Sequence, residues 1–125
     1  MRRHLAAGER PLLWVGSSKR DLLEFPYPVA TEIGYALGMA QFGGRHPAAK
    51  AWKGAGPRVL EVVENFDGNA YRAVYTVRFA RAVYVLHCFQ KKSPTCIKTA
   101  RTDVELVHRR LNAALFDYEA RYGQD

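Results

Sequence analysis

The stretch AYRAVYTVRFARAVYVLHCFQ, residues 70–90, decides the fold. It contains two runs of strand-forming residues that meet at Ala80 and Arg81. In the first run, side chains alternate with the period of two that is typical of a half-buried strand. One face of this run carries Tyr71, Ala73, Tyr75, Val77 and Phe79, and the other carries Arg72, Val74, Thr76 and Arg78. The stretch therefore predicts two antiparallel strands of one sheet.

Two further strands are predicted upstream. The run RVLEVVENF, residues 58–66, is followed by the turn signal DGN, residues 67–69, and so pairs as a hairpin with the strand that starts at residue 70. The run PLLWVG, residues 11–16, is a short apolar segment that Gly16 ends. The segment RHPAAKAWKGAGP, residues 45–57, is predicted to be a loop because of its Gly and Pro content.

Two helices are predicted between the first strand and this loop. Ser17 or Ser18 can cap a helix whose first turn carries Asp21. A second helix is expected to start near Pro28 and to end at the glycines 43–44. Its apolar face recurs at helical spacing and consists of Val29, Ile33, Leu37 and Ala40.

A third helix is predicted at the C-terminal end of the chain. Thr102 and Glu105 have the spacing of a capping box at its start, and Gly123 lies at its end. Its apolar stripe consists of Val104, Val107, Leu111, Leu115 and Tyr118. The predicted order is β-α-α-β-β-β-α, an α+β class with a small antiparallel sheet and helices packed on it. We expect a single domain over residues 1–125, with a flexible N-terminus at residues 1–10.

The charge of the chain is positive and unevenly distributed. There are 19 Lys and Arg residues against 12 Asp and Glu residues, a formal net charge of +7. Two segments, residues 33–60 and 68–102, carry basic residues and no acidic ones. This segregation favours a one-sided positive field and a polyanionic partner such as nucleic acid.

Several functional classes are disfavoured by the sequence. Only two cysteines occur, Cys88 and Cys96, fewer than a disulfide framework or a four-ligand zinc site requires. No apolar run approaches 18 residues, and the first 11 residues lack the apolar core of a signal peptide. No phosphate-binding loop or other local catalytic motif is present. We expect a cytoplasmic protein with no metal, no cofactor and no membrane partner.

A cationic patch is predicted at one end of the sheet. In a hairpin that turns at residues 80–81, a residue near position 90 lies opposite one near position 71. Arg72, Gln90, Lys91 and Lys92 are therefore expected to converge, with no carboxylate in the surrounding stretch of sequence. Such a patch can bind an anion, or it can protect a sheet edge from aggregation. Spacing alone does not decide between the two.

Three other side chains are candidates for contacting RNA or moving protons. His87 alternates with Val83, Val85 and Phe89, which places it on the core face, where a hydrogen-bonded structural His is commoner than a catalytic one. Trp52 lies between two lysines in the expected loop and is a candidate for stacking on a base. Arg78 lies roughly 20 Å from Arg72 along the strand, so both can follow a nucleic-acid backbone but cannot hold one phosphate.

The stretch YRAVYTVRFARAVYVLHCFQKKSPTCIKTARTDVELVHRRL, residues 71–111, resembles the phage-derived HigB-like toxins of type II toxin–antitoxin modules, within the RelE superfamily. The similar features are a Tyr-Arg-x-x-Tyr strand, a strand ending in His-x-Phe-Gln-Lys-Lys, and a Thr just before the last helix. Upstream, WVGSSKRDLLEFP and WKGAGPRVLEV agree as well. The resemblance covers nearly the whole chain.

The resemblance implies a RelE-like fold and a metal-independent endoribonuclease that cuts mRNA at the ribosome. It also implies a cognate antitoxin, often of the helix-turn-helix type, as a partner besides ribosome and mRNA. Carried over, the catalytic positions are Arg72, Lys91 and Lys92, with His87 as a weak acid–base candidate. The RNA-binding positions are Lys53, Arg58, Arg78, Gln90 and Trp52. The alternatives are a toxin of related fold that inhibits DNA gyrase, and a non-catalytic RNA-binding module.

Overall fold

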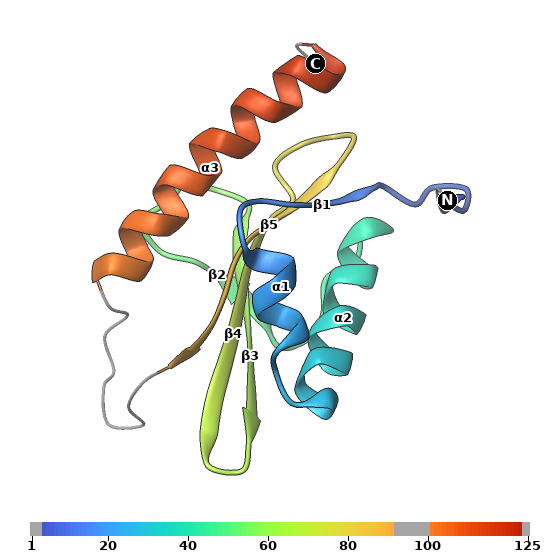
Figure 1. The fold of residues 1–125 in the computed structure, drawn as a ribbon. Coiled ribbons are helices and arrows are strands. Elements are labelled where there is room, and N and C mark those ends of the chain that lie inside the picture. Colours follow the sequence, from blue (N-terminus) through green and yellow to red (C-terminus); the bar gives the residue numbers. More distant parts are fainter. Residues whose placement is uncertain (1–3, 92–100, 124–125) are drawn as a thin grey trace.

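A computed structural model describes residues 4–91 and 101–123 of the chain (Figure 1). Five strands form one mixed sheet, and helices pack on both of its faces, which confirms the predicted α+β class. The strands are β1 (Leu12–Trp14), β2 (Ala49–Ala51), β3 (Val59–Phe66), β4 (Asn69–Thr76) and β5 (Val83–Lys91). The helices are α1 (Ser18–Leu23), α2 (Tyr27–Gln41) and α3 (Arg101–Tyr122).

The sheet has the strand order β1-β5-β4-β3-β2. Neighbouring strands from β2 to β5 are antiparallel, as the meander predicts, whereas β1 lies parallel to β5 at the edge. The predicted turn between β3 and β4 is confirmed. Asp67 and Gly68 occupy it with φ of 52° and 80°, the positive values at both central residues that a type I′ hairpin turn requires.

Each face of the sheet has its own hydrophobic core. Helices α1 and α2 cover one face, and α3 runs across the other (Figure 1). The predicted apolar face of α2 is buried in the first core, with Ile33 and Leu37 no more than 1% exposed. On the other face, Val107, Leu111 and Tyr118 of α3 pack on strand residues, whereas Leu115 is 42% exposed, so the predicted stripe on α3 is wrong at that position.

A β-bulge at Leu86 changes which side chains of β5 face which helix. Val74 of β4 pairs with His87, but the next residue, Tyr75, pairs with Val85, so Leu86 is the extra residue. The bulge shifts the alternation, and His87 therefore lies on the α3 face, opposite to Val85. The expectation that these two residues share a face is wrong. Arg110 of α3 donates from Nη1 to the Leu86 carbonyl at 2.9 Å and satisfies that group at the bulge.

Two further expectations are corrected. The segment 45–57 is not wholly a loop, because residues 49–51 form the edge strand β2. The capping box at Thr102 is wrong, because α3 already includes Arg101, and Glu105 accepts a hydrogen bond from the Arg101 side chain at 3.0 Å. Among the described residues, no helix combines the length and the hydropathy needed to cross a lipid bilayer.

Candidate functional site

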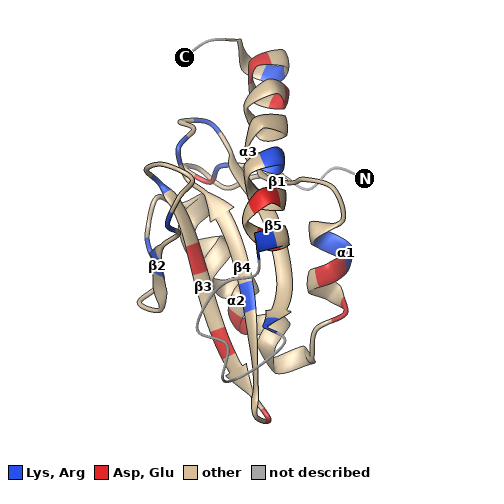
Figure 2. Ribbon diagram, turned by 90° about the vertical axis from the view of Figure 1, so that its left-hand side faces the viewer, with Lys and Arg blue, Asp and Glu red and all other residues tan. Residues whose placement is uncertain are grey.

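A hollow of about 270 Å³ lies on the α3 face of the sheet, at the end where β3 turns into β4. No described residue of α3 lines it. The described residues that line it are Lys50, Val63, Asn65, Gly68, Asn69, Ala70, Arg72 and Lys91. Three cationic side chains from three different strands therefore surround one cavity. In Figure 2, basic positions on β2 and β4 lie on either side of β3.

A buried carboxylate lies among these cations. Glu61 of β3 is 7% exposed, and its Oε2 lies 3.3 Å from Nη1 of Arg72 on β4. Its Oε1 lies 3.7 Å from Nζ of Lys50 on β2. The cationic patch is thus not free of acid, because the pairing of strands brings in a carboxylate that is distant in sequence. Glu61 orients Arg72 and part of its charge offsets that of the two cations.

Of the four residues predicted to converge, the structure brings Arg72 and Lys91 together. Gln90 lies on the opposite face, where it lines a depression with Phe25 of the α1–α2 connection, because neighbouring residues of a strand point to opposite faces. Lys92 lies outside the described residues. The sequence does not predict Lys50 at this site, because the strand that positions it lies in a segment with the composition of a loop.

His87 lies under the first turn of α3. It is 7% exposed, its Nε2 is 2.8 Å from Oδ1 of Asp103, and its ring stacks on Phe89 with centroids 4.4 Å apart. Burial lowers the pKa of His87, and the hydrogen bond and charge of Asp103 oppose this shift only in part. A neutral, buried imidazole that joins β5 to α3 fits a structural His.

The remaining predicted RNA-binding residues lie away from the hollow. The Trp52 ring is buried, 5% exposed and edge-on to Phe89, so the expectation that a loop presents it to a base is wrong. Arg78 donates from Nη2 to the carbonyls of Ala55 and Pro57, at 3.1 and 3.4 Å.

Lys53 and Arg58 are exposed but lie near the opposite end of β3. Arg58 precedes β3 and is five residues from Val63, the residue of β3 that pairs with Arg72. At about 3.3 Å per residue this separates Arg58 from the hollow by roughly 17 Å. These two cations can therefore contact only a more distant part of an RNA strand.

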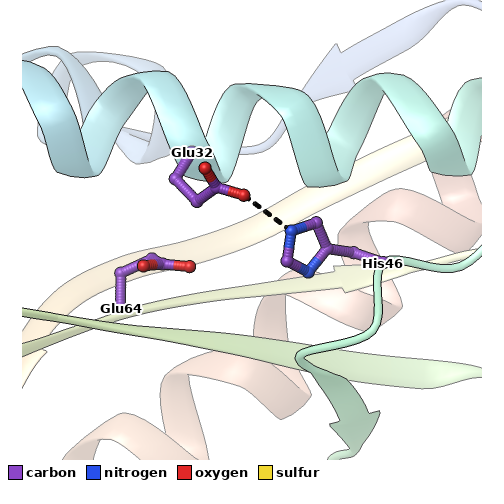
Figure 3. Close-up of side chains that lie close together, drawn as sticks. All are labelled: Glu32, His46 and Glu64. Atoms are coloured by element: carbon purple, nitrogen blue, oxygen red, sulfur yellow. Dashed lines mark hydrogen bonds and ion pairs between the residues drawn. The ribbon is translucent and has the colours of Figure 1, made fainter.

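A second cluster on the other face is formed by Glu32 of α2, His46 and Glu64 of β3 (Figure 3). Their ligand atoms lie within 4.8 Å of one another, and one His with two carboxylates is a set of ligands that can hold a metal ion. Nε2 of His46 lies 2.7 Å from Glu32, and Nδ1 accepts a hydrogen bond from the Ala48 backbone N–H at 3.0 Å.

These two contacts define the tautomer of His46. With Nδ1 acting as the acceptor, the neutral ring carries its proton on Nε2 and donates it to Glu32. A metal on Nε2 would need that proton moved to Nδ1, where it would face the Ala48 N–H. The arrangement therefore fits a structural hydrogen-bond network better than a metal site. Burial, followed by the charge of Glu32, raises the pKa of Glu64.

A family model described as phage-derived protein Gp49-like (DUF891) matches residues 20–112. The chain belongs to this family. No curated protein matches it. The Gp49-like family is toxin-like and related to the RelE- and HigB-type toxins, and membership is consistent with a toxin of a toxin–antitoxin module and suggests a cognate antitoxin as partner.

The Gp49-like match covers every described residue that lines the hollow. It also covers the His87–Asp103 pair and Arg110 at the bulge. It starts within α1 and ends within α3, so β1 and the last turns of α3 lie outside it. The candidate site is therefore part of the region that defines this Gp49-like chain as a family member.

Proposed function

We propose that this Gp49-like protein is a toxin that cleaves mRNA at the ribosome, with the scissile phosphate bound in the hollow between β2, β4 and β5. The observation that carries the proposal is the convergence of Lys50, Arg72 and Lys91 on one cavity. Three strands of a sheet hold these cations, so they form a preorganised anion site. Lys92 is a further proposed contact that lies outside the described residues.

The chemistry that the hollow supplies is charge stabilisation. Cleavage without a metal requires a 2′-OH aligned with its phosphate, stabilised developing charge, and proton transfer. Arg72, oriented by Glu61, and Lys91 supply the second requirement. The described lining contains neither His nor carboxylate, and His87 is engaged with Asp103. Alignment by the ribosome would offset this weak acid–base set, which explains a dependence on the ribosome.

The partner that neutralises such a toxin is proposed to be a helix-turn-helix antitoxin that covers the hollow. Covering it would block access of RNA without any change in the fold. A complex in which Lys50 and Lys91 keep the reactivity towards amine-modifying reagents that they show in the free protein would contradict this steric mechanism.

The test is primer extension on a reporter mRNA in a reconstituted translation reaction, with and without ribosomes. We expect discrete cuts only when ribosomes are present. Lys91→Ala and Lys50→Ala should reduce cleavage by about 100- to 1,000-fold, the range for loss of one stabilising group. Arg109→Ala, which removes an exposed cation of α3, is the matched control and should leave cleavage unchanged. Full cleavage by a folded double variant at positions 50 and 91 would contradict the assignment.

A second candidate is a non-catalytic RNA-binding protein. It is favoured because the described lining of the hollow contains neither a His nor a carboxylate for proton transfer. It predicts RNA binding whose affinity falls steeply with salt, and no cleavage products in either reaction.

A further inference from the structure

We infer that the end of the β3–β4 hairpin is a subsite that reads the base of the nucleotide whose phosphate the cations bind, through the carboxamide of Asn65. The inference rests on the proposed function and adds to it the element that selects the sequence. Asn65 is exposed and lines the same hollow as Lys50, Arg72 and Lys91.

The strand register places this subsite directly beside the cations. Asn65 of β3 pairs with Ala70 of β4, and Ala70 pairs with Lys91 of β5. One step along the strands on the same face, Val63 pairs with Arg72. At about 4.8 Å between neighbouring strands, the backbones of Asn65 and Lys91 are roughly 10 Å apart. The methyl group of Ala70 between them leaves the space that a larger side chain would fill.

The lining of the hollow divides into two chemical halves. Its cations recognise a phosphate but carry no information about the base. A carboxamide offers one acceptor and two donor hydrogens on adjacent atoms, which match the exposed edge of an unpaired base. Asn69 also borders the hollow, but it alternates with Ala70 along β4, so its carboxamide, which donates to the Asp67 carbonyl at 3.3 Å, lies on the opposite face. Val63 and Ala70 provide an apolar floor.

The hairpin holds the Asn65 amide in place. Its two strands pair without a break from Val59 and Thr76 to Phe66 and Asn69. The two-residue turn has both positive φ values that a type I′ turn needs, so the two strands are joined without additional loop residues. A rigid element positions a reading group more accurately than a long loop does. The hollow has a volume of about 270 Å³. Typical small-molecule sites have volumes of about 300–1,000 Å³, so a hollow slightly smaller than these is of the size expected for one nucleotide.

The experiment maps cleavage sites on a reporter mRNA with ribosomes for the wild type, for the hairpin variant Asn65→Ala, and for the control Asn112→Ala on exposed α3 surface. We expect the hairpin variant to keep cutting while its preference at one nucleotide position falls by about 5- to 100-fold, the range for a bidentate contact to a base. The control should keep the wild-type pattern. Thermal unfolding of each variant establishes that it is folded.

The outcomes separate this inference from the proposed function. Unchanged base preference in the folded hairpin variant overturns the inference and leaves the nuclease intact. Loss of all cleavage by that variant overturns it as well, because the Asn65 amide would then act in binding and not in selection. No cleavage by the wild type overturns the proposed function instead.

In that last case, binding to the four short homopolymeric RNAs tests the subsite without any reaction. The hairpin variant should bind the four RNAs with affinities that differ less than those of the wild type. Lys91→Ala should weaken the binding of all four RNAs equally. Equal binding of the four by the wild type would overturn the inference.

Discussion

Arg72 of β4 and Glu61 of β3 form an ion pair in which the side chains are only 12% and 9% exposed, with 3.3 Å between Nη1 and Oε2. The pair lies beside the hollow and joins two neighbouring strands. A guanidinium that is held in this way is already oriented before a phosphate arrives. In the proposed site the same carboxylate would compete with that phosphate, so a change of Glu61 tests both the stability of the fold and the affinity for RNA.

The stability prediction concerns removal of the acid. Glu61→Ala leaves Arg72 largely buried without this carboxylate, so the free energy of unfolding should fall by about 3–5 kcal/mol. The control Glu105→Ala breaks an exposed pair with Arg101 and should cost less than about 1 kcal/mol. Urea unfolding measures the free energy of unfolding of both variants. Equal losses would show that the Glu61–Arg72 pair contributes no more than an exposed ion pair does.

The affinity prediction uses a milder change. Glu61→Gln keeps the shape of the side chain and removes its charge, so Arg72 and Lys50 present more positive charge to RNA. Filter binding should show tighter RNA binding with a steeper salt dependence than the wild type. Weaker binding with an unchanged salt slope would mean that Glu61 serves only to place Arg72.

Arg110 is expected to be a structural residue of the sheet. Its Nη1 satisfies the Leu86 carbonyl at the bulge and its Nη2 donates to Ser17 Oγ at 3.1 Å. Arg110→Ala removes both contacts, and the free energy of unfolding should fall by about 1–3 kcal/mol. Arg109→Ala removes the same charge from the exposed neighbouring position and should change it by no more than about 0.5 kcal/mol. Indistinguishable urea midpoints for the two variants would refute this role.

Trp52 should contribute to folding and not to RNA binding. Because its ring is buried against Phe89, Trp52→Ala should lower the free energy of unfolding by about 3–5 kcal/mol. Lys53→Ala, at the next and exposed position, should change stability by less than about 0.5 kcal/mol. A Trp52→Ala protein as stable as the wild type but impaired in RNA binding would restore the stacking role.

His87 is expected to make the free energy of unfolding depend on pH. Its folded-state pKa lies below the ordinary 6.5, so the unfolded chain binds the proton first as the pH falls. The free energy of unfolding should therefore decrease below about pH 6.5, with a slope of at most about 1.4 kcal/mol per pH unit from this group.

The pH prediction is checked by urea unfolding between pH 7.5 and 5 with two variants. His87→Gln should show a flatter curve than the wild type. His108→Gln, at an exposed position of α3, should keep the wild-type slope. The raised pKa of Glu64 acts with the opposite sign, and it is common to all three proteins, so the difference curve isolates His87. Parallel curves for all three would exclude His87 as the cause.

The sequence predicted the parts of the fold whose patterns are local. The alternation along β4, the turn at Asp67–Gly68 and the apolar face of α2 all follow from residues close together in the chain. The edge strand β2 was missed because Ala-Lys-Ala is too short to show alternation, and its pairing with β3 comes from tertiary contacts.

The candidate site was predicted only in part for a related reason. The meeting of Arg72 and Lys91 follows from hairpin geometry. The positions of Lys50 and Glu61 follow from which strands are neighbours, which periodicity does not reveal. His87 was assigned to the wrong face because the bulge at Leu86 has no signal in the sequence, where no Gly or Pro interrupts β5. The sequence pattern predicts an uninterrupted period of two along β5, and the extra residue Leu86 breaks that period.

The parallel edge strand has a consequence for the order in which the chain folds. Leu12 pairs with Val83, so β1 cannot join the sheet until β5 has been synthesised and has left the ribosome. The hairpin of β3 and β4 needs only local contacts and can form first, whereas closing a loop that runs from β1 to β5 carries a large entropic cost. We expect the N-terminal strand to be the last part to gain protection in pulsed hydrogen exchange during refolding. A newly made chain would then acquire its hairpin before the sheet has both of its edges.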